Sequence, residues 1–396
     1  SDLSLLGGLA DRFGRKRMFI VEMVLFCIFL ALLVFSPGYS WMLAFLFGMG
    51  LALGCDYPTA HMVISESIPT GHRGQLVLSA FAFQALGALV GTAVGYLVLA
   101  QRADVGAWRL MYATAIIPAV AVLAARFTIP DSGHWLVARG RIPEAEAATA
   151  RLLRRRPPYP AEIRLAPPAG AAERSGSYAD LFRGRALRAT ILASVPWFLQ
   201  DLATYGIGIF TPTILASVLG ARTQHAHNIA AVVHNDILAA KGAAFIDVPL
   251  ILGILAAVLL VERVGRIRLQ VVGFLGCAVG LGLASASLLA DGGSSLALLL
   301  TGFMLFSLMT NLGPNAMTYL LAGEVFPTRL RGKGAGLAAS VAKVGAVATA
   351  FLFPVLQKAL GTPLLLALLV GASLAGALVT WLARIETRGV SLEDID

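Results

Sequence analysis

Long apolar stretches separated by short polar loops are the dominant pattern of this chain. Near-continuous hydrophobic runs occur at 18–36, 41–65, 75–99, 108–127, 189–219, 244–261, 269–290, 294–321, 334–360 and 363–383. A helix needs about 20 apolar residues to cross a hydrocarbon core of ~30 Å, and the runs lack the alternation of a barrel strand. The pattern predicts an all-α polytopic membrane protein with ten complete spans, and residues 1–9 are interpreted as the last turns of another helix.

The composition supports this prediction. The 396 residues are 58% hydrophobic and only 13% charged, whereas ordinary soluble domains are about 25% charged. The three cysteines, Cys27, Cys55 and Cys277, lie inside apolar runs and form no CxxC or Cys/His cluster. We therefore expect no disulfide framework, no metal site and no cofactor. His225, His227 and His234 share the loop 220–243, which is interpreted as a solvated loop.

The net charge of +9 arises from Lys and Arg residues that lie mainly in the loops on one side of the predicted membrane. If the spans cross the bilayer alternately, all but six of the 31 Lys and Arg residues fall on one side. The positive-inside rule makes that side cytoplasmic, together with both ends of this chain. Nucleic-acid binding is disfavoured because the charges are dispersed. We expect the protein to be integral to the plasma membrane, which in a bacterium is the inner membrane.

An internal repeat divides the chain. The pattern E-x-x-P-T-x-x-R-G occurs at 66–74 and again at 324–332, and Asp11–Arg15 corresponds to Glu262–Arg266 at nearly the same offset. Such repeats predict two homologous bundles related by an axis along the membrane normal, an architecture typical of transporters. The predicted parts are an N-terminal bundle (1–127), a charged, Pro-rich cytoplasmic linker (128–188), a C-terminal bundle (189–384) and a cytoplasmic tail (385–396).

Acidic and basic side chains gather at the repeated corners. An acid beside a helix end, followed by Gly and Arg, can form ion pairs that hold neighbouring helices together. We interpret these residues as a cytoplasmic gate whose pairs break and reform, with static topology anchors as the alternative. The candidates are Asp11, Arg12, Arg15, Glu66, Arg73, Glu262, Arg266, Glu324 and Arg331.

Ionisable residues within the spans are candidates for function, because each costs about 2.5–3.5 kcal/mol at mid-bilayer. Trp197, Asp201 and Tyr205 recur every four residues and therefore share one helical face. The other polar positions in the spans are Asp56, Tyr57, Gln84, Asn315 and Lys343.

Together these side chains can hold an oxyanion. Lys343 supplies the positive charge, and the amide, phenol and indole groups supply hydrogen-bond donors. A carboxylate such as Asp201 admits an anion once it has bound a proton, so proton and anion would enter together. Packing between helices remains the alternative for Trp197 and Tyr205. For Asp56 the alternative is an ion pair with an Arg of the absent first helix, and for Gln84 it is a contact between helices.

Three motifs resemble those of the major facilitator superfamily. Residues 7–16 (GGLADRFGRK) are similar to the loop between its second and third helices. Residues 131–136 and 386–393 resemble elements that follow the sixth and twelfth helices of its sugar-porter-like members. The resemblance implies two bundles of six helices, of which this chain lacks the first helix and most of the second.

The spans also resemble one subfamily, the phosphate:proton symporters. The shared elements are D-Y-P at 56–58, Gln84, W-x-x-x-D-x-x-x-Y at 197–205, G-P-N-A-x-T at 313–318, and Lys343. The resemblance implies proton coupling through Asp56 and Asp201. It also implies a substrate site made of Tyr57, Gln84, Trp197, Asp201, Tyr205, Asn315 and Lys343.

These observations predict a secondary active transporter, not an enzyme, that carries a small anion with protons by alternating access. Inorganic phosphate is the first expected substrate, and an organic acid, a sugar or another metabolite is the alternative. A non-transporting sensor or a truncated relic is the alternative of another class. No P-loop, nucleophile elbow or H-E-x-x-H motif occurs. The expected partners are the anion, protons and the lipid bilayer, with the protein acting as a monomer.

Overall fold

The chain folds into helices that group into two compact units. The computed structural model describes residues 15–67, 73–102, 104, 106–131, 136–137, 140–153, 177–218, 248–289, 295–327 and 330–390. One unit comprises Ser1–Pro69 and Trp108–Gly176, and the other comprises Thr70–Ala107 and Ser177–Asp396. The sequence-based boundaries at 127 and 188 remain predictions. In the structure, residues 70–107 group with the C-terminal unit.

The first unit contains α2 (Arg15–Val34), α3 (Tyr39–Ser67), α5 (Ala107–Phe127) and the short α7 (Ile142–Leu153). Helices α2 and α5 are antiparallel, because Lys16 Nζ donates to the Phe127 carbonyl (3.1 Å) and Arg109 donates to the Ser36 carbonyl at the opposite end (2.9 Å). Apolar side chains of α2 and α5, with Met49 of α3, form the core between these contacts. Helix α7 packs Ala145 and Ala148 against Leu136 in a separate small cluster.

The second unit contains most of the candidate site residues, with Asp56 and Tyr57 in the first unit. Its elements are α4 (Arg73–Gln101), the 3₁₀ turn η2 (Tyr178–Phe182), α8 (Gly184–Val218), a helix at 248–264, α10 (Arg266–Leu289), α11 (Leu296–Leu312), α12 (Pro314–Glu324), α13 (Arg331–Leu360) and α14 (Thr362–Leu382). The core lies where α8, α10, α11, α13 and α14 meet, and Leu281, Phe303, Phe306 and Phe353 are among its most buried members. This packing places α8 beside α13 and α10 beside both α11 and α14.

Each of the ten predicted spans is helical where the structure describes it, but one of them is divided into two helices. The run 294–321 was expected to be one helix, and it is two, because α11 ends at Leu312 and α12 begins at Pro314. Proline has no N–H to donate and disfavours helical geometry in the residue before it. Gly313 accordingly has φ −121° and ψ −95°, outside the helical region. The break sets Asn315 at the start of a new helix.

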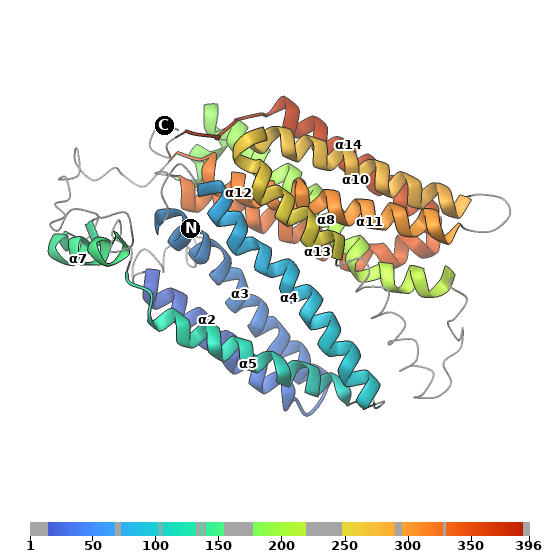
Figure 1. The fold of residues 1–396 in the computed structure, drawn as a ribbon, viewed down its shortest axis with the longest axis horizontal. Coiled ribbons are helices and arrows are strands. Elements are labelled where there is room, and N and C mark those ends of the chain that lie inside the picture. Colours follow the sequence, from blue (N-terminus) through green and yellow to red (C-terminus); the bar gives the residue numbers. More distant parts are fainter. Residues whose placement is uncertain are drawn as a thin grey trace. The chain divides into compact units, whose positions relative to one another are not determined.

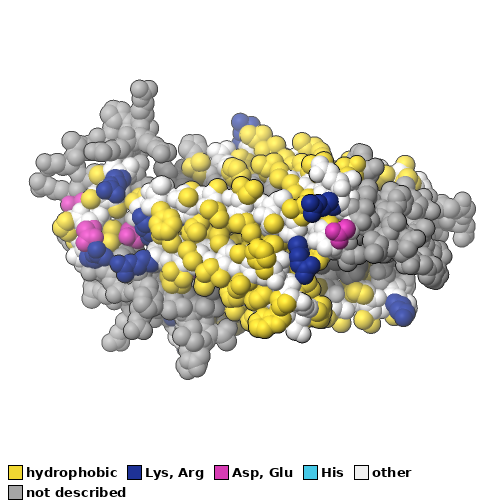
Figure 2. Space-filling model, turned by 90° about the horizontal axis from the view of Figure 1, so that it is seen from below, with side chains coloured by type: hydrophobic (Ala, Val, Ile, Leu, Met, Phe, Trp, Pro, Cys, Tyr) yellow, Lys and Arg dark blue, Asp and Glu magenta, His cyan; other side chains and the backbone are white. Residues whose placement is uncertain are grey.

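The surfaces of both units suit a lipid environment. Within the described residues, seven helical segments are long and apolar enough to cross a membrane. Large apolar side chains are exposed on them, among them Phe83, Ile117 and Phe351. On the face drawn in Figure 2, hydrophobic side chains cover the middle and charged ones lie toward the ends. Apolar surface of this extent indicates contact with lipid.

Candidate substrate site

Helix α8 carries a row of three candidate site residues in the second unit. Asp201 and Trp197 are buried, with 2% and 3% of their surface exposed, while Tyr205 is 37% exposed. The Trp197 side chain hydrogen-bonds to Asp201, so its indole N–H is the donor. The three residues therefore lie on one side of α8, as their four-residue spacing predicts.

Lys343 of α13 completes this row. Its Nζ donates to Asp201 Oδ2 at 3.0 Å and to the Tyr205 hydroxyl at 3.1 Å. The Lys343 side chain is 50% exposed, whereas the Asp201 side chain is 3% exposed. The Asp201 carboxylate is therefore buried, and the Lys343 side chain that contacts it is partly accessible. We call Asp201, Lys343, Tyr205 and Trp197 the charge-pair site.

Asn315 belongs to a neighbouring network of amides. Its Oδ1 accepts from Gln200 Nε2 (3.1 Å), and its Nδ2 donates to Asn311 Oδ1 (2.6 Å). Asn311 in turn donates to the Leu250 carbonyl, which connects α11 to the helix at 248–264. Gln200 also donates to Thr204 (2.8 Å). These bonds fix the orientation of the Asn315 amide against Gln200, the residue that directly precedes Asp201 in the chain.

The sequence interpretation missed Gln200 and Asn311. Both were detectable as amides inside apolar runs, since Gln200 directly precedes Asp201 and Asn311 lies one helical turn before Asn315. Their partners come from other helices, and these cannot be deduced from spacing along one helix.

An aromatic cluster borders the charge-pair site. The Trp197 ring meets Tyr319 of α12 edge-on at 6.5 Å, and Phe81 of α4 stacks on Tyr319 at 5.0 Å. Gln84 lies one turn beyond Phe81 on α4 and is exposed, with no hydrogen bond to the described part of the chain. The structure therefore places Gln84 on a helix that packs beside the site but does not bring its amide to Asp201.

Asp56 lies in the first unit, where Arg126 of α5 holds it. Both Arg126 Nη atoms donate to the carboxylate, Nη2 at 2.9 Å, and Nη1 also donates to the Phe19 carbonyl. The sequence interpretation offered, as the alternative for Asp56, an ion pair with an Arg from outside these 396 residues, and the structure instead pairs Asp56 with Arg126. Tyr57 lies in α3, but its side chain is outside the described residues. Glu22 of α2, buried at 3% exposure, is a membrane-embedded carboxylate that the sequence interpretation overlooked.

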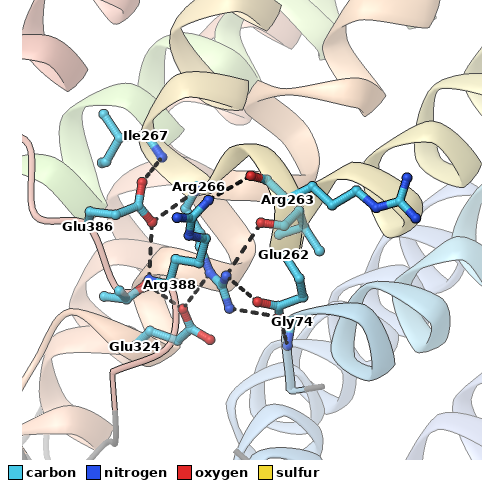
Figure 3. Close-up of polar contacts among 10 residues, drawn as sticks. Gly74, Glu262, Arg263, Arg266, Ile267, Glu324, Glu386 and Arg388 are labelled. Atoms are coloured by element: carbon cyan, nitrogen blue, oxygen red, sulfur yellow. Dashed lines mark hydrogen bonds and ion pairs between the residues drawn. The ribbon is translucent and has the colours of Figure 1, made fainter. Parts of the chain in front are cut away.

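Part of the predicted cytoplasmic gate forms a cluster around Arg266 in the second unit (Figure 3). Arg266 is 1% exposed and donates to both carboxylate oxygens of Glu262 (2.8 and 3.1 Å) and to Glu324 (3.2 Å). Glu386 of the tail accepts from the backbone N–H groups of Arg266 and Ile267 at the start of α10. We call Glu262, Arg266, Glu324 and Glu386 the Arg266 cluster.

Two glycines allow the close approaches in this cluster. Glu262 Oε1 accepts from the Gly74 N–H at 3.0 Å, and a Cβ at Gly74 would lie 2.5 Å from that oxygen. Gly265 has φ +98° between two helices, a conformation that favours glycine. The Arg-Gly end of the repeated motif thus places the N-terminus of α4 against the Glu262 carboxylate. Negative charge at a helix N-terminus is electrostatically favourable.

The remaining gate candidates are described only in part. Arg331 is the first residue of α13. Asp11 and Arg12 lie outside the described residues, as do the histidine loop and the side chains of Arg15, Glu66 and Arg73.

Comparison with solved structures identifies the fold. The chain superimposes on a proton:xylose symporter of the major facilitator superfamily with a TM-score of 0.80, at 19% identity, covering 99% of this chain and 85% of the other. The inward-open xylose transporter of Escherichia coli gives a TM-score of 0.66, also at 19% identity and covering 98% and 84%. The chain therefore has the fold of these major facilitator proteins.

The family follows from the sequence comparisons. Residues 4–396 match the family described as "Sugar (and other) transporter", and the chain belongs to it. It is 29% identical to a niacin transporter of Acinetobacter baylyi, covering 86% of this chain and 72% of that one. A repressible high-affinity phosphate permease of Neurospora crassa is 30% identical, covering 86% and 65%. A putative inorganic phosphate transporter of Schizosaccharomyces pombe is 27% identical, covering 99% and 76%. The protein is a transporter and not an enzyme.

Proposed function

We propose that the protein is a symporter that carries inorganic phosphate with protons. The observation that carries this proposal is the pairing of a buried carboxylate, Asp201, with a half-exposed ammonium group, Lys343, inside the membrane-spanning bundle. The phosphate transporters among its relatives support the choice of substrate.

Charge balance explains why a proton and an anion would move together. Asp201 and Lys343 form a neutral pair, and a net charge in a low-dielectric environment is costly. When Asp201 binds a proton, Lys343 loses its counter-ion, and a monovalent anion can take the place of the carboxylate. One proton and one dihydrogen phosphate leave the charge of the site unchanged. Either one alone would leave it charged.

The donors around Asp201 suit an oxyanion. Lys343 is half exposed, so a ligand can reach its ammonium group without moving a helix. Protonated Asp201 becomes an O–H donor, and the Tyr205 hydroxyl, which accepts from Lys343, keeps its own hydrogen to donate. Three donors on two helices can contact oxygens that point in different directions, as those of a tetrahedral phosphate do.

Uptake into proteoliposomes tests this proposal. With an inward proton gradient, the purified protein should accumulate radiolabelled phosphate, and a protonophore should abolish the accumulation. Uptake that persists unchanged with the protonophore contradicts proton coupling. Failure of excess unlabelled phosphate to compete contradicts the substrate.

An aromatic carboxylate is a second candidate substrate. The rings of Trp197, Tyr319 and Phe81 lie next to the charge-pair site, and a flat ring bearing a carboxylate could contact both. A niacin transporter among the relatives supports this choice. Competition of labelled phosphate uptake by nicotinate and by inorganic phosphate separates the two candidates, since only the true substrate should inhibit at micromolar concentration.

A further inference from the structure

A groove of ≈ 380 Å³ opens on the second unit between the start of α8 and the end of α14, away from the charge-pair site. Its walls are apolar: Leu187 and Ile191 come from α8, and Val379, Leu382 and Ala383 come from α14 or the residue after it. Leu382 is 68% exposed and Leu187 39%. An apolar groove that opens outward at the ends of two spans lies at the level where acyl chains meet headgroups.

Arginines surround the same end of these helices. Arg188, which lines the groove, crosses from α8 and donates to the carbonyls of Ala383 (3.3 Å) and Arg384 (2.9 Å) just after α14 ends. Its charge thereby offsets the negative end of the α14 dipole. Arg183 and Arg185 flank Gly184 at the groove and are exposed, and neither side chain makes a hydrogen bond or ion pair with the described part of the chain.

Two carboxylates of the described residues near this end already accept backbone hydrogen bonds. Asp180 of η2 accepts from the Ser177 N–H in the capping box of that turn (2.8 Å), and Glu386 accepts from the first N–H groups of α10. The Arg384 guanidinium lies over the ring of Trp381 at 4.8 Å, an aromatic that is 51% exposed. Tryptophan at such a position is typical of a membrane interface. Within the described residues, the arginines at this end (Arg183, Arg185, Arg188 and Arg384) outnumber the two carboxylates, so the groove combines an apolar slot with a net positive rim.

We propose that this groove binds an anionic glycerophospholipid. One acyl chain would lie along Leu187 and Ile191, and the phosphate diester would contact Arg183 and Arg185. The positive rim selects against neutral and zwitterionic lipids, because each Lys or Arg near the surface contributes about 1 kcal/mol toward an anionic headgroup. This end of α8 and α14 is on the side that the charge distribution predicts to be cytoplasmic, where anionic lipids concentrate.

Native mass spectrometry of the purified full chain tests the proposal. The protein is titrated with phosphatidylglycerol and, separately, with phosphatidylcholine. Arg183→Gln/Arg185→Gln should weaken phosphatidylglycerol binding about tenfold or more, since two rim charges are lost. The matched control Arg263→Gln/Arg268→Gln, also two exposed arginines of the same unit, should change it less than about twofold. Ile191→Trp, which fills the groove, should weaken the binding of both lipids.

Each arm can overturn the proposal. Equal losses in the rim and control variants would mean that only diffuse surface charge attracts the lipid. Unchanged binding in Ile191→Trp would remove the acyl chain from the groove, and Leu187→Trp repeats this arm if the first variant does not fold. Arg183→Lys/Arg185→Lys keeps the charge and should retain binding. Displacement of phosphatidylglycerol by millimolar inorganic phosphate would assign the rim to free phosphate instead of lipid.

Discussion

Asp201→Asn is the substitution that separates substrate binding from proton coupling. The asparagine has the size of the aspartate, and its Oδ1 can still accept the bond from Lys343 Nζ, which is 3.0 Å long in the parent. The variant cannot take up a proton, so the site is fixed in a form that resembles protonated Asp201. We expect it to bind and exchange phosphate but not to concentrate it against a gradient.

The size of the effect follows from the pair geometry. Two unit charges 3.0 Å apart attract by about 5 kcal/mol at an effective dielectric constant of ~20. The desolvation of the buried carboxylate offsets much of this, and solvent screens the half-exposed Lys343. We therefore expect a net loss of stability of about 1–2 kcal/mol in the variant. Asp201→Asn removes the negative charge that balances Lys343, so the variant should bind the anion without a proton, and its phosphate affinity should depend less on pH than that of the parent.

Two measurements on the same proteoliposomes make the test. A gradient of about two pH units, acidic outside, supplies ~2.7 kcal/mol and supports an accumulation of about 100-fold for one proton per anion. The parent should approach this ratio, and the variant should equilibrate without accumulation. Counterflow, which measures exchange without a gradient, should remain within about threefold of the parent, because binding and reorientation are retained.

One result refutes the reasoning. If Asp201→Asn accumulates phosphate as well as the parent does, Asp201 is a structural residue and the coupling proton is carried elsewhere. Asp104→Asn is the matched control, because Asp104 is an exposed carboxylate that bonds only locally, to the Gly106 N–H. It should leave both measurements unchanged.

Three further predictions concern the ion pairs and the helix ends. Arg126→Gln should destabilise the protein by about 3 kcal/mol because it leaves Asp56 without its partner. The double variant Asp56→Asn/Arg126→Gln should lose less stability than the two single variants added together. Additive losses of stability, measured by thermal unfolding, would argue against a coupled pair. Glu324→Gln should slow transport while leaving equilibrium phosphate affinity within about tenfold, and a greater loss of affinity would contradict a gating role. Gly74→Ala should lower the unfolding temperature by forcing a Cβ to 2.5 Å from a carboxylate oxygen, whereas Gly87→Ala, with nothing within 4 Å, should not.

The sequence predicted the spans well because the bilayer imposes a simple requirement. A helix that crosses it must be apolar over about 20 residues, and that property is local and readable. The spacing of Trp197, Asp201 and Tyr205 also predicted their shared face, since helical periodicity is local too. The break at Gly313 was missed because the apolar run continues through it. The dipeptide Gly313-Pro314 was the available signal.

Partner choice between helices could not be predicted in the same way. Arg126 was interpreted only as part of the cytoplasmic charge, and its pairing with Asp56 depends on how α3 and α5 pack. The same holds for Asn311 and Gln200, whose bonds join different helices around Asn315. Such contacts come from tertiary packing, on which hydropathy carries no information.

The two carboxylates predicted to couple protons, Asp56 and Asp201, differ in a way that bears on which one moves the proton. Arg126 contacts Asp56 through two nitrogens, and the Arg126 side chain is 9% exposed. A guanidinium does not lose its charge, and a bidentate pair leaves the carboxylate few free lone pairs. Lys343 makes one bond to Asp201, shares its ammonium group with Tyr205 and is half exposed. A single bond from a half-exposed ammonium group can be exchanged for an arriving anion more readily than a buried bidentate pair. Within the described residues, this difference favours Asp201 as the group that gains and loses a proton in each cycle, with Asp56 and Arg126 holding α3 and α5 together.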